Sequence, residues 1–230
     1  MATVRQARRE FEPDPVEAAC ICQQAGAHSI VAHLREDRRH IQDKDIFKLK
    51  EVVKVKFNLE MSLCPEIISI ARKLKPEQVT LVPERRQEIT TEGGLHVLKN
   101  SARIRKAVDV LAPRNALISL FIAPLKIQIE ATKKIGISMI ELHTGKYATA
   151  PNKQQALREL KKIEEAVCFA QSLGLTVNAG HGLNYENTLA ITRIKGIEEL
   201  NIGHAIVSRA IFVGLKKAVE EMLGIIRRKK

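Results

Sequence analysis

The sequence contains no tryptophan, and aromatic residues make up only 3% of its 230 residues, whereas 45% are hydrophobic. The core must therefore be filled by Ile, Leu, Val and Ala, which favours a layered α/β protein over an all-β sandwich. A chain of this length and apolar content is expected to form a single domain around one core, spanning residues 1–230.

The chain also lacks paired cysteines and long apolar runs. Its four cysteines, at positions 20, 22, 64 and 168, form no CxxC pair and no ligand cluster, so we expect reduced thiols in a cytoplasmic protein. The longest apolar runs, such as residues 116–123, are the size of a strand and far too short to span a membrane. Neither a metal site nor membrane association is expected.

Positive charge is abundant, with 38 Lys and Arg against 26 Asp and Glu and a formal net charge of +12. The basic residues are scattered over helical segments, and the single cluster, residues 227–230, is typical of a solvated helix end that the helix dipole favours. The sequence has no RNA-type aromatic motif and no zinc-finger spacing, so nucleic-acid binding is not expected. Anionic metabolites remain the expected partners.

Seven short β-rich runs alternate with longer helical patterns, as in the βα units that build a parallel sheet. The runs are Ser29–Leu34, Val55–Glu60, Gln78–Val82, Leu117–Phe121, Met139–His143, Thr176–His181 and Glu199–His204. An open doubly wound sheet would need a crevice motif such as GxGxxG after an early strand, and none is present. We therefore predict a (β/α)8 TIM-type barrel whose first strand is missing, with an extra helix in each of the long gaps before Leu117 and Thr176.

Polar residues gather at the carboxyl ends of these runs, where barrels of this type build their active sites. His33 and Glu60 end the first two runs, and Glu84 follows the third. The remaining members of this rim are Glu141, His143, His181 and His204. Any one of them has an ordinary structural explanation, but together they indicate acid–base chemistry.

Two glycine-containing loops, residues 178–184 and 201–205, leave the last two runs, and we expect Asn184 to cap the helix that follows the first loop. Loops in these positions commonly bind phosphate through helix N-terminal amides, although the glycines could simply tighten turns. Arg35 lies close enough to the first rim position to reach a second anion. The long polar loop of residues 83–94 predicts a lid. Two phosphorylated substrates are therefore expected.

These segments together resemble the pyridoxine 5'-phosphate synthase family, whose members close the pyridine ring in vitamin B6 synthesis. The resemblance rests on residues 33–41, 58–61, 83–94, 141–145, 178–183 and 200–206. It implies condensation of 1-deoxy-D-xylulose 5-phosphate with 3-amino-2-oxopropyl phosphate to give pyridoxine 5'-phosphate, inorganic phosphate and water. It also implies that no cofactor is needed and that dimers assemble into a homo-octamer.

The resemblance further implies a role for individual residues. His33 and Glu60 would accept protons, His181 would donate one, and Glu141 would stabilise the transition state. The substrate-binding residues would be Arg35, His40 and Thr90 for the deoxyxylulose phosphate, and Arg8, Gly182, Gly203 and His204 for the aminoketone phosphate. Because Glu60 lies among apolar neighbours in sequence, partial burial would raise its pKa and make it a stronger base.

The family opens with a strand that ends in Asn-x-Asp-His, and this sequence has no counterpart of it before Ala2. Either the chain is truncated at its N-terminus, or it is a degenerate homologue that binds phosphorylated ligands without full activity. The presence of the other site residues favours truncation.

Two other functions compete with this interpretation. A sugar-phosphate isomerase or aldolase would need a Schiff-base lysine, and the nearest candidates, Lys56 and Lys146, do not end a predicted strand. The second competing function is that of a non-enzymatic subunit that binds ligands or takes part in assembly.

Overall fold

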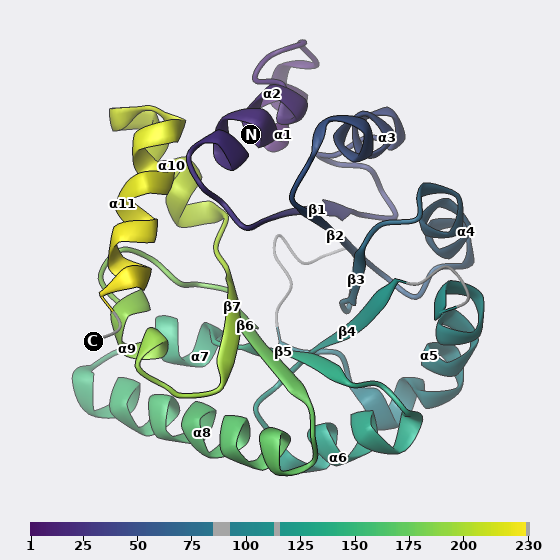
Figure 1. The fold of residues 1–230 in the computed structure, drawn as a ribbon, viewed down its shortest axis with the longest axis vertical. Helices are drawn as coiled ribbons and strands as arrows, with labels where there is room; N and C mark the ends of the chain where they lie inside the picture. The colour runs from purple at the N-terminus through teal and green to yellow at the C-terminus, as the bar shows by residue number, and fades with distance from the viewer. Residues whose placement is uncertain (85–92, 113–115, 229–230) are drawn as a thin grey trace.

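The computed structural model describes residues 1–84, 93–112 and 116–228, and in this part of the chain seven strands form one parallel sheet that curls on itself (Figure 1). The strands are β1 (Ser29–Leu34), β2 (Lys56–Met61), β3 (Gln78–Leu81), β4 (Leu117–Ile122), β5 (Met139–His143), β6 (Thr176–Gly180) and β7 (Ile197–Asn201). They pair in chain order, each parallel to the next. This uninterrupted order is that of a β/α barrel, because a doubly wound sheet reverses its order at a switch point.

The first six strands agree with the predicted runs to within one residue at each end, and the last strand does not. The final strand was expected at Glu199–His204, but β7 begins at Ile197 and ends at Asn201. Pairing stops at Asn201 because its partner in the ladder, Gly180, is the last residue of β6. His204 is therefore not a strand end, as the sequence suggested, but the first residue of the following helix.

Helices cover the outside of the curled sheet. They are α1 (Ala2–Arg8), α2 (Pro15–Gln24), α3 (Asp43–Val52), α4 (Pro65–Leu74), α5 (Val97–Leu111), α6 (Lys126–Ile135), α7 (Gly145–Ala148), α8 (Lys153–Ser172), α9 (Thr188–Thr192), α10 (His204–Val213) and α11 (Leu215–Arg227). The extra helix predicted before Thr176 is α7, whereas α5 is the only helix between β3 and β4 among the described residues. Asn184 was expected to cap the following helix, but α9 starts at Thr188 and its N-cap residue is Asn187. The Asn184 side chain instead accepts from the backbone N–H groups of residues 186 and 187, in the turn before the helix.

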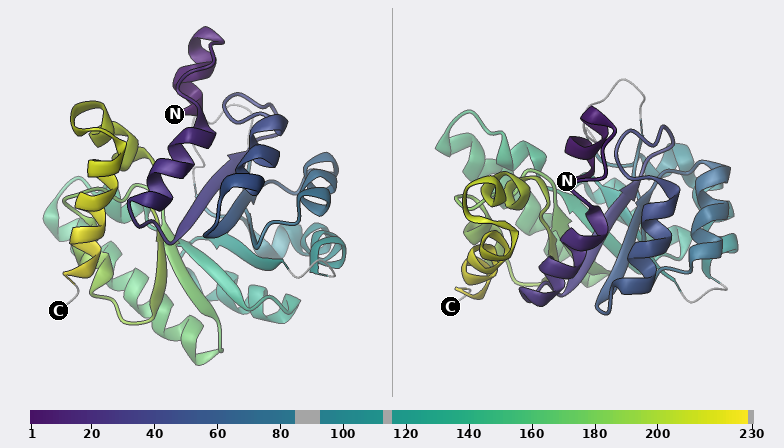
Figure 2. Two further views of the ribbon diagram at one scale, coloured as in Figure 1. Left: turned by 45° about the horizontal axis from the view of Figure 1, so that its top comes forward. Right: turned by 90° about the horizontal axis from the view of Figure 1, so that it is seen from above.

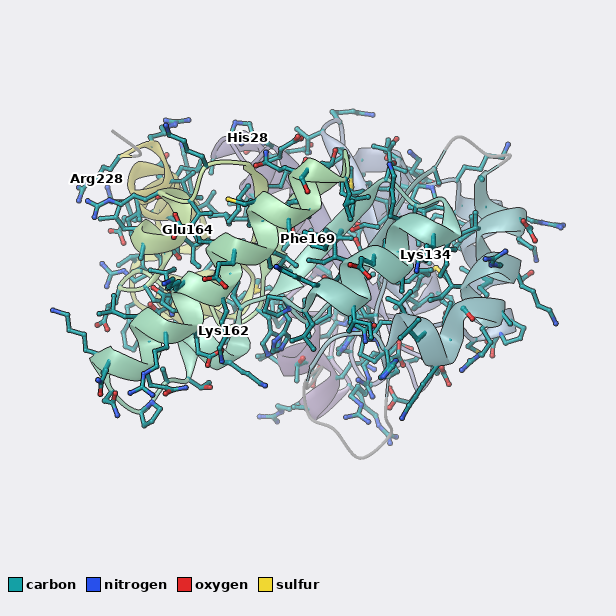
Figure 3. All side chains as sticks on the ribbon, turned by 90° about the horizontal axis from the view of Figure 1, so that it is seen from below. His28, Lys134, Lys162, Glu164, Phe169 and Arg228 are labelled. Carbon is teal, nitrogen blue, oxygen red and sulfur yellow. The ribbon has the colours of Figure 1, made fainter. Side chains whose placement is uncertain are left out.

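The outer helix faces carry the scattered charge that the composition predicted. Figure 3 labels Lys134 on α6 and Lys162 and Glu164 on α8, and all three side chains are exposed. The inner helix faces and the strands supply the aliphatic core. No helix in the described ranges is both long and apolar enough to cross a lipid bilayer.

The sheet has two edges, because β1 and β7 each have a strand partner on one side only in the described part of the chain. Helices α2 and α11 pack against each other beside these edges (Figure 2). An ion pair between Lys56 of β2 and Glu199 of β7 links the two sides. The expected seven-strand version of the barrel is confirmed, since β1 and β7 do not pair with each other in the described part of the chain.

Candidate active site

A cavity of about 1170 Å³ runs from the carboxyl ends of the strands along the space between β1 and β7. Most of the predicted site residues line it: His33, Arg35, His40, Glu60, Glu141, His181, Gly182, Gly203 and His204. Arg8 does not line this cavity; it is the exposed last residue of α1. Thr90 and most of the predicted lid, residues 83–94, lie outside the described residues.

The imidazole of His33, near the end of β1, lies between two carboxylates. One is that of Glu60, near the end of β2, and the other is that of Glu84, in the loop after β3. Its Nε2 lies 2.9 Å from Oε1 of Glu84, and its Nδ1 lies 4.0 Å from Oε2 of Glu60. The Glu60 side chain keeps 24% of its surface exposed toward the cavity, but the surrounding protein still raises its pKa by desolvation, partly offset by His33. A carboxylate of raised pKa beside an imidazole is suited to accepting protons near neutral pH.

Glu141 of β5 is almost completely buried, with 2% of its surface exposed. Burial raises its pKa to about 8, the charges of Glu60 and Glu199 add to the rise, and a hydrogen bond from Asn201 opposes it. That bond runs from Asn201 Nδ2 to Glu141 Oε2 and measures 2.6 Å. At neutral pH the Glu141 carboxyl group is therefore mostly protonated and can donate a hydrogen bond to developing negative charge.

The position of the Glu141 side chain depends on a glycine opposite it. A Cβ atom on Gly180 would lie 2.2 Å from Glu141 Oε1, so a larger residue could not occupy this place without displacing the carboxyl group. Neither Gly180 nor Asn201 was among the predicted site residues. Their position at the ends of β6 and β7 is the signal that could have indicated them.

His181 follows β6 in the left-handed region, with φ of 80°, which is unusual for a residue with a side chain. Thr144 stabilises this backbone because its single hydroxyl hydrogen is shared between the carbonyl oxygens of Gly180 and His181, which lie 2.8 and 2.6 Å from Oγ1. The His181 ring stacks on His143 with centroids 4.7 Å apart. Burial lowers the pKa of His181, so its protonated form releases a proton readily.

The predicted anion-binding residues Arg35 and His40 lie in the loop after β1. Arg35 is 3% exposed and donates to Asp37, and the His40 ring lies 5.7 Å from that of His33. Burial lowers the pKa of His40 to about 4, and the neighbouring positive groups contribute. Its Nδ1 accepts from the backbone N–H of Ile41, so a neutral His40 carries its proton on Nε2.

A buried ion pair anchors this loop to the N-terminal helix. Arg5 of α1 donates through both terminal nitrogens to Asp45 of α3, at 2.9 and 2.5 Å, and also to the backbone carbonyl of His40. Sequence reasoning missed Arg5, because nothing in the local pattern of α1 distinguishes it from the other arginines there.

The glycine loops lie at the carboxyl end of the strands, as does the candidate lysine Lys146 in α7, whereas the other candidate, Lys56, lies at the opposite end. Gly182 adopts φ of 77° and packs against Ala148 of α7, and Gly203 is the N-cap residue of α10. Lys56 begins β2, at the end of the strand opposite the rim, and is paired with Glu199. Among the described residues, no three His, Cys, Asp or Glu side chains converge as metal ligands would.

The fold is that of a β/α barrel, and its rim gathers histidines and carboxylates of the kind that acid–base enzymes use. The family model of the pyridoxal phosphate biosynthesis protein PdxJ matches residues 1–228, and the chain belongs to this family. It is 54% identical over 228 residues to the pyridoxine 5'-phosphate synthase of Trichlorobacter lovleyi, an alignment that covers 99% of this chain and 95% of the relative. A Prochlorococcus marinus protein of the same name is 53% identical, with 98% and 94% covered.

Solved structures of other barrels share the fold. The thiamine phosphate pyrophosphorylase of Pyrococcus furiosus superimposes with a TM-score of 0.65 at 17% identity, covering 96% of this chain and 93% of that one. The tryptophan synthase A-subunit of the same organism gives 0.61 at 12% identity, with 92% and 94% covered. At such low identities the likeness shows the fold alone.

Proposed function

We propose that the protein is a pyridoxine 5'-phosphate synthase that condenses 1-deoxy-D-xylulose 5-phosphate with 3-amino-2-oxopropyl phosphate, releasing phosphate and water. The observation that carries the proposal is the convergence, in one cavity, of two carboxyl groups with raised pKa and two imidazoles from four different strand ends. Imine formation, phosphate expulsion and ring closure need several proton transfers at different atoms, which one acid–base pair could not serve.

The four groups divide this work according to their environments. Glu60 and His33 accept protons, because their side chains are neighbours in the wall of the cavity and burial raises the pKa of Glu60. His181 donates, because burial makes its imidazolium a stronger acid. Glu141, mostly neutral and held by Asn201, stabilises negative charge in the transition state.

The two phosphate groups bind on opposite sides of this centre. Arg35, His40 and Thr90 hold the deoxyxylulose phosphate, and Gly182, Gly203, His204 and Arg8 hold the aminoketone phosphate. The support for the second group is that Gly203, the N-cap residue of α10, and His204 line the cavity, because the first turn of a helix has N–H groups free to bind phosphate. For Arg8, which does not line this cavity, the support is the family resemblance alone.

The experiment is to mix the purified chain with both substrates and to measure inorganic phosphate release and pyridoxine 5'-phosphate formation by mass spectrometry. Product formation that requires both substrates supports the proposal. Binding of either substrate in a calorimeter without product identifies a homologue that binds phosphorylated ligands without full activity. Inactivation by borohydride in the presence of one substrate would reveal a Schiff-base lysine and refute the assignment.

We also propose that the enzyme is a cytoplasmic homo-oligomer, an octamer built from dimers. Free thiols at all four cysteines support the compartment. Self-association is supported by apolar side chains left in solvent, with Phe11 88%, Ile211 78% and Phe212 81% exposed, and by α10, none of whose residues is buried. Light scattering after gel filtration should give the mass of eight chains of 25.7 kDa.

A further inference from the structure

Glu84 is a buried carboxylate at the rim that has no role in the scheme above. It follows β3 by three residues, and its side chain is only 4% exposed. Its carboxylate oxygens face two groups from the β1 side: Oε1 lies 2.9 Å from His33 Nε2, and Oε2 accepts from the backbone N–H of Glu36 at 3.0 Å. Glu84 thus connects the loop after β3 with the end of β1.

The charge state of Glu84 determines where His33 carries its proton. Burial alone would raise the Glu84 pKa, but the hydrogen bonds from His33 and Glu36, with the charges of His33 and Arg35, outweigh it and lower the pKa. An ionised carboxylate can only accept hydrogen bonds. The proton between the two groups therefore lies on His33 Nε2.

This arrangement leaves His33 Nδ1 as the nitrogen that faces the reaction side. Glu60 Oε2 of β2 lies 4.0 Å from Nδ1, and the His40 ring from the loop after β1 lies 5.7 Å from the His33 ring. With Glu84 on the third side, these are the titratable groups next to the imidazole among the residues that the structure describes. A neutral His33 with Nε2 protonated has a lone pair on Nδ1 and can accept a proton there.

We propose that Glu84 is a positioning residue that fixes the tautomer and ring orientation of His33, so that Nδ1 accepts the substrate proton. A buried carboxylate on the far nitrogen of a catalytic histidine orients the ring and stabilises the imidazolium after proton transfer. The inference rests on the proposed function, because it assumes that His33 acts as a base. It adds a third member, contributed by the loop after β3, to the pair formed by His33 and Glu60.

The discriminating variants are Glu84→Gln and Glu84→Asp. Glutamine keeps the size of the side chain but carries no charge, and if its amide donates to Nε2 it reverses the tautomer. We expect kcat to fall about 100-fold with KM changed less than threefold, and the acidic limb of the pH–rate profile to move to lower pH, because a neutral amide stabilises the imidazolium less. Aspartate, which keeps the charge, should restore part of kcat.

Glu66→Gln is the matched control. It removes the same charge from an exposed carboxylate that pairs with Arg38 in the loop after β1, and it does not touch His33. We expect wild-type kcat and an unchanged pH profile. If Glu84 only fastened the loop, Glu84→Gln would lower stability and raise KM while leaving the acidic limb in place, and this result would overturn the proposal.

A readout without turnover separates this inference from the proposed function. In protein labelled with 15N-histidine, the His33 resonances, assigned with a His33→Gln variant, should report the Nε2-protonated tautomer in the wild type. In Glu84→Gln its population should fall, because an amide, which both donates and accepts, no longer excludes the Nδ1-protonated form. A wild-type chain that made no product but showed this change would refute the synthase and keep the role of Glu84 in setting the tautomer. An Nδ1-protonated His33 in the wild type would refute that role.

Discussion

The substitution Gly180→Ala tests whether the placement of Glu141 controls catalysis. The added Cβ would lie 2.2 Å from Glu141 Oε1 and 3.1 Å from the Cβ and the carbonyl oxygen of Asn201. Restoring ordinary contact requires the carboxyl oxygen to retreat by about 1 Å. It has little room, because Glu141 is buried and bonded to Asn201 on its other oxygen.

The expected effect is on rate more than on folding. A displacement of about 1 Å in a catalytic group costs on the order of 100-fold in rate, and overpacking of this kind costs about 1–3 kcal/mol of stability. We therefore expect kcat for pyridoxine 5'-phosphate formation to fall about 100-fold while the protein stays folded. The φ of Gly180 is not among the positive values, so alanine fits the backbone and the effect is one of contact alone.

Gly224→Ala in α11 is the control, because a Cβ there meets nothing within 4 Å. It should leave kcat unchanged and stabilise the chain by up to about 1 kcal/mol, since glycine is a poor helix former. Urea unfolding monitored by circular dichroism, together with the product assay, measures both quantities. A Gly180→Ala enzyme with kcat within twofold of wild type, or one whose loss of activity matched its loss of folded protein, would refute the reasoning.

Three further predictions concern stability. The raised pKa of Glu141, about 8, means that the folded state binds its proton more tightly than the unfolded state, so its contribution to stability falls as pH rises from about 4.5 to 8. Glu141→Gln should therefore lose less stability than wild type between pH 5 and pH 8 in urea unfolding; an equal loss would contradict the assignment. Arg5→Met leaves Asp45 buried without its partner and should lower the free energy of unfolding by about 3–5 kcal/mol. The double variant Arg5→Met with Asp45→Leu should lower it by less, and an equal loss in the two variants would argue against a buried pair. Asp14→Ala removes the side-chain cap of α2, a 2.8 Å bond from the Val16 N–H, and should lower the free energy of unfolding by about 1 kcal/mol, whereas Asp14→Ser should retain most of it.

Much of the fold followed from local patterns in the chain. The β-rich runs and the helices between them predicted a parallel sheet in chain order, because period and turn chemistry are properties of neighbouring residues. The start of the last strand was predicted too far along the chain. The strand begins at Ile197, which is 6% exposed and pairs with Val177, so its strand conformation depends on a partner in β6.

The residues at the rim show the same division between what the local sequence determines and what the tertiary structure determines. The sequence by itself determined that His33, Glu60, Glu141 and His181 would lie at the carboxyl ends of strands, since parallel strands bring those ends to one edge. Their environments were decided by residues distant in the chain: the Glu84 carboxylate beside His33, and the Asn201 amide on Glu141. Protonation state depends on burial and on through-space neighbours, and only the tertiary structure fixes these.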